Sequence, residues 1–213
     1  REALFDALQR REVYASTGPR ITLRLFAGWG FTGEELDDAD FAARGYSAGV
    51  PMGGQLNGAC EQRGQLRILV KASKDPLGAN LDRIQIVKGW MDQGEHRERV
   101  YDVALSDGRE VGEDGQVLEV GNTVDTKNAT YANTIGAAEL GTVWIDREFD
   151  PEQQAFYYAR VLEIPTPRWT TYDAAAFEIP PPDNVPGTVQ QRVYSSPVWY
   201  EPFEVATGSD CRG

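Results

Sequence analysis

The sequence has little histidine, no long apolar run and no excess of positive charge, and each absence narrows the possible functions. His96 is the only histidine among 213 residues, so a metal site built from several imidazoles is nearly excluded within this chain. No apolar run approaches the roughly 20 residues that a membrane-spanning helix needs. A net charge of −12 disfavours nucleic acid and anionic membranes as partners, because both require a basic surface.

Cysteine is also scarce, and the two cysteines present, Cys60 and Cys211, match no zinc-binding spacing. An even pair without a metal pattern is compatible with one disulfide in an oxidising compartment. Two free buried thiols are the alternative. Cys60 and Cys211 are therefore disulfide candidates, and the sequence leaves both states open.

The most informative stretch is AFYYARVLEIPTPRWTTY, residues 155–172. Residues 156–162 are aromatic and β-branched with few polar positions, a pattern that predicts a central, mostly buried strand. Pro165 and Pro167 each remove a backbone donor and fix φ, so we expect the hydrogen-bonded ladder to end there. Arg168 and Trp169 follow on this stiffened turn, which is either a corner of the fold or the wall of a site.

The rest of the chain predicts short strands joined by turns. Residues 1–12 have the pattern of the end of a helix, with Leu4, Phe5 and Leu8 on one apolar face. Nothing caps the start of this helix, so we expect the chain to be a piece of a longer protein. The other predicted strands are 13–16, 20–27, 66–72, 83–91, 97–105, 129–135, 142–145, 177–179, 189–194 and 197–200. The sequence thus predicts a mainly β fold, an antiparallel β-sandwich preceded by one short helix.

Aromatic and aliphatic residues are the expected core. We expect Tyr157 or Tyr158, Val161, Ile86 and Leu69 to be buried there. Four further aromatics also fit a core better than a sugar-binding platform, namely Trp144, Trp169, Trp199 and Tyr200.

Two arginines flank a glycine turn in RREVYASTGPRI, residues 10–21. A glycine after a strand lets backbone amides turn towards an anion, and arginine pairs with phosphate or sulfate. Thr-Gly-Pro is also an ordinary turn, so the anion site is one of two interpretations. The candidates for the rim of a substrate site are Arg11, Tyr14, Thr17, Gly18, Arg20, Arg168 and Trp169.

Acid–base groups give no catalytic assignment. His96 lies among charged residues at the start of a predicted hairpin strand, where we expect it to be exposed. The carboxylate pairs Asp37/Asp38 and Asp107/Glu110 lie in polar loops, whereas catalytic carboxylates need a desolvated cleft. The sequence therefore assigns no catalytic residue, metal ligand or cofactor to this chain.

Five segments resemble, in the same order, the C-terminal part of a bacterial family labelled domain of unknown function 3604. They are REALFDALQRREVYASTGPRI, GVPMGG, GANLDRIQIVKGW, AFYYARVLEIPTPRWTTYDA and YSSPVWYEPF. That family is similar to the PHP-type metal-dependent hydrolases, the polymerase-and-histidinol-phosphatase group. Its members are typically longer and commonly carry export signals.

The resemblance implies an upstream metallohydrolase barrel with histidine and aspartate ligands for a divalent metal. Residues 1–27 would then be the final helix and strand of that α/β barrel, and residues 28–213 a β-sandwich domain. The implied location is periplasmic or extracellular. The implied partners are the upstream barrel and a small anionic substrate, with no nucleic acid and no membrane span.

These observations favour two functions of different classes. The first is a non-catalytic C-terminal module of an exported PHP-like hydrolase acting on phosphate or related esters, which predicts that Leu4, Phe5 and Leu8 are exposed. The alternative is a glycan- or protein-binding β-sandwich, which predicts a shallow aromatic groove on a sheet face. A free-standing carboxylate hydrolase is a third interpretation, and it requires two carboxylates about 5–10 Å apart in a cleft.

Overall fold

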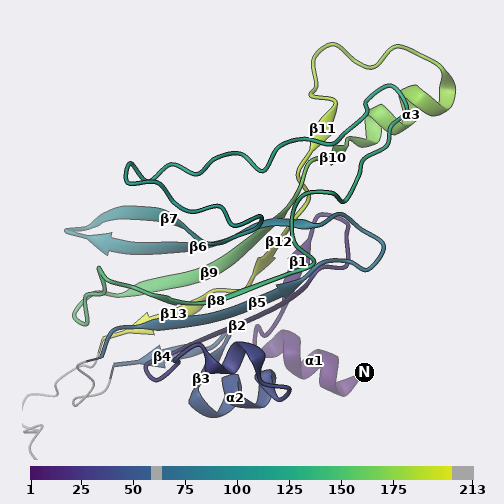
Figure 1. The fold of residues 1–213 in the computed structure, drawn as a ribbon. Coiled ribbons are helices and arrows are strands. Elements are labelled where there is room, and N and C mark those ends of the chain that lie inside the picture. The colour runs from purple at the N-terminus through teal and green to yellow at the C-terminus, as the bar shows by residue number, and fades with distance from the viewer. Residues whose placement is uncertain (59–63, 203–213) are drawn as a thin grey trace, which may run out of the picture.

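Two β-sheets packed face to face form the body of the protein, as the two layers of Figure 1 show. The structure is a computed structural model that describes residues 1–58 and 64–202. The disulfide candidates Cys60 and Cys211 lie outside these residues, so their pairing stays a prediction. The expected mainly β, antiparallel sandwich is confirmed.

The larger, seven-stranded sheet is organised around the strand that the sequence marked as central. Strand β9 pairs with β6 on one edge and with β12 and β13 on the other. β7 continues the sheet beyond β6, and β1 and β4 lie beyond β12 and β13. Among the described residues of this sheet, the β13–β4 pairing is the one parallel pairing. The strands are β1 (Tyr14–Ser16), β4 (Gln55–Asn57), β6 (Leu81–Asp92), β7 (Glu95–Leu105), β9 (Ala155–Glu163), β12 (Arg192–Ser195) and β13 (Val198–Glu201).

The smaller sheet has four antiparallel strands in the order β3-β2-β5-β8. They are β3 (Gly49–Pro51), β2 (Thr22–Gly28), β5 (Arg67–Ser73) and β8 (Glu139–Ile145). A short 3-10 helix, η1 (Glu34–Asp37), and helix α2 (Phe41–Ala48) supply the side chains that cover its outer face. Strand β2 pairs with β5 along its whole length, so residues 22–28 pack as part of the sandwich. The boundary near residue 27 stays a prediction.

Alternating burial along β9 builds the core between the sheets. Tyr157, Ala159 and Val161 are fully buried, whereas the residues between them are half-buried on the other face. Of the two alternatives Tyr157 and Tyr158, Tyr157 is the buried one, and the predicted burial of Val161, Ile86 and Leu69 is confirmed. Leu69 differs from the others in its surroundings, because it packs with Phe26 and Phe31 beneath η1 and α2.

A buried ion pair crosses the core between the sheets. The ammonium of Lys88 lies 2.6 Å from a carboxylate oxygen of Asp146, and the Tyr157 hydroxyl donates to the same oxygen at 2.7 Å. Lys88 also donates to the carbonyl of Glu148 at 3.0 Å. Because all three side chains are buried, each depends on the others to satisfy its polar groups.

Two predicted strands are wrong. Phe177 ends a helix, α3 (Trp169–Phe177), instead of beginning a strand at residues 177–179. The first half of α3 is aromatic and β-branched, which favours a strand, but its second half is rich in alanine, which favours a helix, and the helix forms. Residues 129–135 form a loop in which Thr130 makes one isolated bridge with Asp125.

The proline pair does end the main ladder, because β9 stops at Glu163. The next residues form a short strand, β10 (Thr166–Pro167), paired with β11 (Thr188–Val189). This two-stranded ribbon carries α3 away from the sandwich in Figure 1.

At the other end of the sequence, helix α1 (Glu2–Gln9) forms where expected and buries none of its residues. None of the helices in residues 1–58 and 64–202 combines the length and the apolar character needed to cross a bilayer.

Candidate ligand-binding site

The outer face of the large sheet gathers aromatic side chains from three strands. Since Tyr157 and Val161 of β9 point into the core, Phe156 and Tyr158 must point outward. The register places Trp199 of β13 opposite Phe156, and Tyr194 of β12 opposite Arg160. Directly paired residues share a face, so these side chains all lie on the outer surface.

Four of these aromatics form a continuous series, which we call the aromatic row: Trp199, Phe156, Tyr158 and Tyr194. The ring centroids are 5.4 Å apart between Trp199 and Phe156, and 6.4 Å apart between Phe156 and Tyr158. Tyr158 and Tyr194 follow at 6.5 Å. The row therefore presents neighbouring ring faces along one line of the sheet.

Glycine at position 89 makes room for this row. Gly89 is paired with Phe156, and a Cβ built on Gly89 would lie 2.2 Å from the ring of Phe156. Any side chain there would push the ring away from the sheet. The ring of Phe156 can therefore occupy its position against β6 because Gly89 has no side chain.

A groove of about 480 Å³ opens at the Trp199 end of the row. Phe156, Trp199 and Met91 contribute apolar surface to it, and His96 and Glu98 of β7 contribute polar groups. His96 is exposed, as predicted. A concave, mainly apolar surface with a few polar groups is the usual form of a small-molecule site.

Beyond Tyr194 the same face becomes cationic. Arg160 of β9, Arg192 of β12 and Arg83 of β6 line a second cavity of about 500 Å³. The outer face thus runs from aromatic rings at one end to guanidinium groups at the other.

A buried carboxyl group, Glu163, lies at the end of β9 and is missing from the sequence-based candidates. Its residue is 2% exposed, and its Oε1 has no hydrogen-bond partner among the described residues. Burial, with a smaller effect of the Asp75 carboxylate, raises the pKa of Glu163 to about 7, against the opposing effect of Lys74. One sequence signal could have indicated this burial. Glu163 falls on the same alternating positions of β9 as the buried residues Tyr157, Ala159 and Val161.

Comparison with known proteins assigns the chain to a family. A family described as "Protein of unknown function (DUF3604)" matches residues 1–202. The chain belongs to the DUF3604 family. Neither the curated proteins nor the solved structures include a match to it.

The DUF3604 structure brings some of the predicted rim residues together at one end of the sandwich. The hydroxyl of Thr17 donates to Gln191 Oε1 at 2.5 Å, and the backbone amide of Arg20 donates to Asp75 Oδ2 at 2.8 Å. This amide is the first cause of the lowered pKa of Asp75. Gly18 lies between them in the loop from β1 to β2, and its φ of 156° is consistent with the predicted turn.

The other rim candidates of the DUF3604 chain lie apart from that loop. Arg11 follows α1 with its carbonyl against Gly53, and Tyr14 is an exposed residue of β1. Arg168 precedes α3, where its Nε is buried without a partner among the described residues, and Trp169 is exposed. The backbone amide of Arg168 donates to the carbonyl of Gly187 at 2.9 Å, whereas that of Arg20 donates to Asp75, so the two arginines are held by different segments.

The described residues of the DUF3604 chain contain no organised acid–base centre and no organised metal centre. One carboxylate of each pair considered from sequence has a structural partner, since Asp38 accepts from Arg44 and Asp107 accepts from the amide of Gly136. Residues 1–58 and 64–202 contain no group of three or more His, Cys, Asp or Glu side chains able to hold a metal ion.

Proposed function

We propose that this DUF3604 chain is a non-catalytic β-sandwich module of an exported, PHP-like hydrolase acting on phosphate or related esters. In this proposal an upstream barrel domain holds the divalent metal and the catalytic ligands. Helix α1 packs as the final helix of that barrel, and the chain places Arg20 and its neighbours at the rim of a site for a small anionic substrate.

The observation that carries this proposal is the exposed apolar face of α1. Leu4, Phe5 and Leu8 are 72%, 59% and 63% exposed, as the module hypothesis predicts. Three large apolar side chains on one helical face mark a surface that another element covers. Covering such a leucine contributes roughly 1.5–3 kcal/mol.

Helix α3 presents a second exposed apolar surface. Helix α3 buries Thr170, Thr171 and Ala174 but exposes Trp169, Tyr172 and Phe177, the reverse of the usual arrangement on a helix. In Figure 1 α1 lies below the sandwich and α3 projects above it, so the two exposed apolar faces are well separated. A domain that covers α1 would therefore have to extend past the end of the sandwich to reach α3.

The test uses the longer protein that contains this chain together with the isolated 213-residue chain. Leu4→Glu with Leu8→Glu should lower both the melting temperature and the metal-dependent phosphatase activity of the longer protein, because the docked face would receive two charges. In the isolated chain the same pair should leave the melting temperature unchanged, since both leucines are exposed there.

Leu77→Glu is the matched control, because Leu77 is a 95% exposed leucine in a loop away from α1. It should change neither protein. Phosphatase activity by the isolated chain with added metal would overturn the proposal, and so would an unaffected longer protein carrying both α1 substitutions.

A second candidate function, binding of a saccharide, is favoured by the aromatic row. Aromatic rings in a shallow groove offer apolar faces to sugar rings while polar groups at the edge reach their hydroxyls. A panel of oligosaccharides is first screened for binding to the wild type. Trp199→Ala should then abolish binding of the selected oligosaccharide, as measured by calorimetry. Trp169→Ala, which removes an exposed indole elsewhere, should leave it intact. Equal affinities of the two variants would argue against this function.

A further inference from the structure

The cationic cavity on the outer face is built from arginines of three adjacent strands. Arg83, Arg160 and Arg192 line it, together with Gln190 and with residues 119–122 of the long loop between β7 and β8. Figure 1 shows this loop passing over β6 and β7. The cavity therefore has a floor of sheet residues and a roof of loop residues.

The guanidinium of Arg160 is held in position while its outer end stays available. Its Nε donates to Gln85 Oε1 at 2.7 Å, and no other hydrogen bond of this guanidinium is made within the described part of the chain. The terminal nitrogens of Arg160, which form the planar fork that binds oxyanions, are thus without a partner there.

Arg192 is fixed in a similar way. Its Nε and Nη2 both donate to the carbonyl of Gln190 at 3.3 Å, and its Nη1 lies 3.5 Å from the Tyr194 hydroxyl. Among residues 1–58 and 64–202, no carboxylate lies within ion-pair distance of Arg160 or Arg192, in contrast to Arg83. Neither of these two positive charges is therefore part of an ion pair within the described residues.

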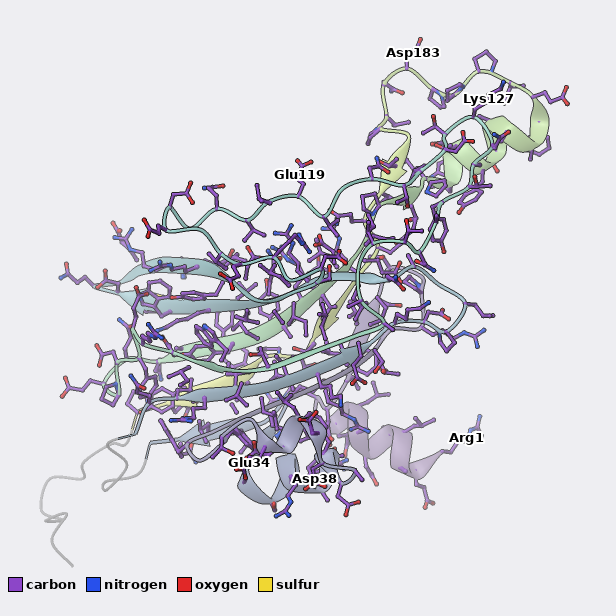
Figure 2. The ribbon with its side chains drawn as sticks, viewed as in Figure 1. Arg1, Glu34, Asp38, Glu119, Lys127 and Asp183 are labelled. Atoms are coloured by element: carbon purple, nitrogen blue, oxygen red, sulfur yellow. The ribbon has the colours of Figure 1, made fainter. Side chains whose placement is uncertain are left out.

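Two carboxylate residues, Asp82 and Glu119, also line the cavity. Asp82 is buried and paired with both Arg83 and Arg109, at 3.1 and 2.5 Å. Figure 2 shows Glu119 of the loop pointing away from the sheet. Since the whole chain carries a net charge of −12, an anion attracted to it must be held by local groups.

We propose that Arg160 and Arg192 form an oxyanion-binding site for a carboxylate, sulfate or phosphate group. The site lies at the Tyr194 end of the aromatic row, so a ligand extending along the face would meet rings after its anionic group. The ligand class that fits both surfaces is an acidic oligosaccharide. This extension rests on the proposed binding of saccharide by the aromatic row, whereas the oxyanion site itself does not.

The experiment is isothermal titration calorimetry on the complete 213-residue chain with three probes: sodium sulfate, a uronic acid hexasaccharide and a neutral hexasaccharide. Ionic strength is kept constant with sodium chloride, because exposed charges are screened. The variants are Arg160→Gln, Arg192→Gln and Trp199→Ala. Arg24→Gln is the matched control, since Arg24 is an exposed strand arginine whose Nη1 also contacts a tyrosine hydroxyl, at 3.3 Å.

We expect the acidic hexasaccharide to bind, with roughly tenfold or greater loss of affinity in Arg160→Gln and Arg192→Gln, because each removes charge-assisted hydrogen bonds. Arg24→Gln should bind as the wild type does. If Arg160→Gln fails to fold, Arg160→Lys replaces it. That variant keeps the charge but loses the planar fork, so it should still bind more weakly than the wild type.

The outcomes separate the oxyanion site from the aromatic row. Sulfate binding that requires Arg160, without binding of either saccharide, supports the oxyanion site and contradicts saccharide recognition. Equal affinity for the neutral and acidic hexasaccharides, unchanged by Arg160→Gln but lost in Trp199→Ala, overturns the oxyanion site and leaves saccharide binding in place. Absence of binding by sulfate and by the acidic hexasaccharide also overturns the oxyanion site.

Discussion

Replacing Glu163 by glutamine should remove a pH-dependent decrease in the free energy of unfolding. Glu163 is buried at the end of β9, and its carboxylate loses hydration without gaining a hydrogen bond at Oε1. Asp75 accepts backbone amides and stays ionised, since its pKa is lowered. Ionisation of Glu163 therefore creates a buried negative charge, and the carboxylate of Asp75 adds a smaller repulsion.

The sign and size of the effect follow from the pKa of Glu163. Its pKa rises from the ordinary 4.5 to about 7 on folding, so the folded protein binds more protons than the unfolded chain within that window. The free energy of unfolding must then fall as pH rises through the window. The full shift corresponds to roughly 3 kcal/mol as an upper figure, because one pKa unit is about 1.4 kcal/mol.

The assay is urea denaturation followed by tryptophan fluorescence at pH values from about 5 to about 8. Glu163→Gln has no titrating group at this position. The difference in free energy of unfolding between the variant and the wild type should therefore grow as pH rises towards about 8, by an amount approaching roughly 3 kcal/mol. Glu113→Gln, which neutralises an exposed loop carboxylate, should follow the wild-type slope. A Glu163→Gln slope equal to that of the wild type would refute the reasoning.

Two further predictions concern packing. Lys88→Met should lower the free energy of unfolding by roughly 3–5 kcal/mol, because it leaves the buried carboxylate of Asp146 without its counter-charge. Adding Asp146→Leu should recover much of that loss in urea denaturation, and no recovery would contradict the ion-pair explanation. Gly45→Ala should cost about 1–3 kcal/mol, since a Cβ there would lie 2.3 Å from the ring of Phe26. Gly30→Ala, with open space around the new methyl group, is the control, and equal midpoints for the two alanine variants would show that the ring moves freely.

The sequence by itself determined the fold class and much of the core. Period-two alternation in residues 156–162 predicted β9 and the burial of Val161, because a strand sends successive side chains to opposite faces whatever lies around it. It left open whether Tyr157 or Tyr158 is the buried tyrosine. The apolar face of Leu4, Phe5 and Leu8 was equally local, being a matter of helical spacing. The wrong strand prediction at residues 177–179 was local as well, since it missed the helix at residues 169–177, which combines strand-favouring and helix-favouring residues.

Only the tertiary structure decided which outward side chains became neighbours. The aromatic row combines residues of β9, β12 and β13, and the cationic cavity combines Arg83, Arg160 and Arg192 from three strands. Trp199 illustrates the difference. The sequence favoured a core position for Trp199, but the core positions of β13 are occupied by Val198 and Tyr200. Strand order and register are set by pairings between residues far apart in the chain, which local periodicity does not specify.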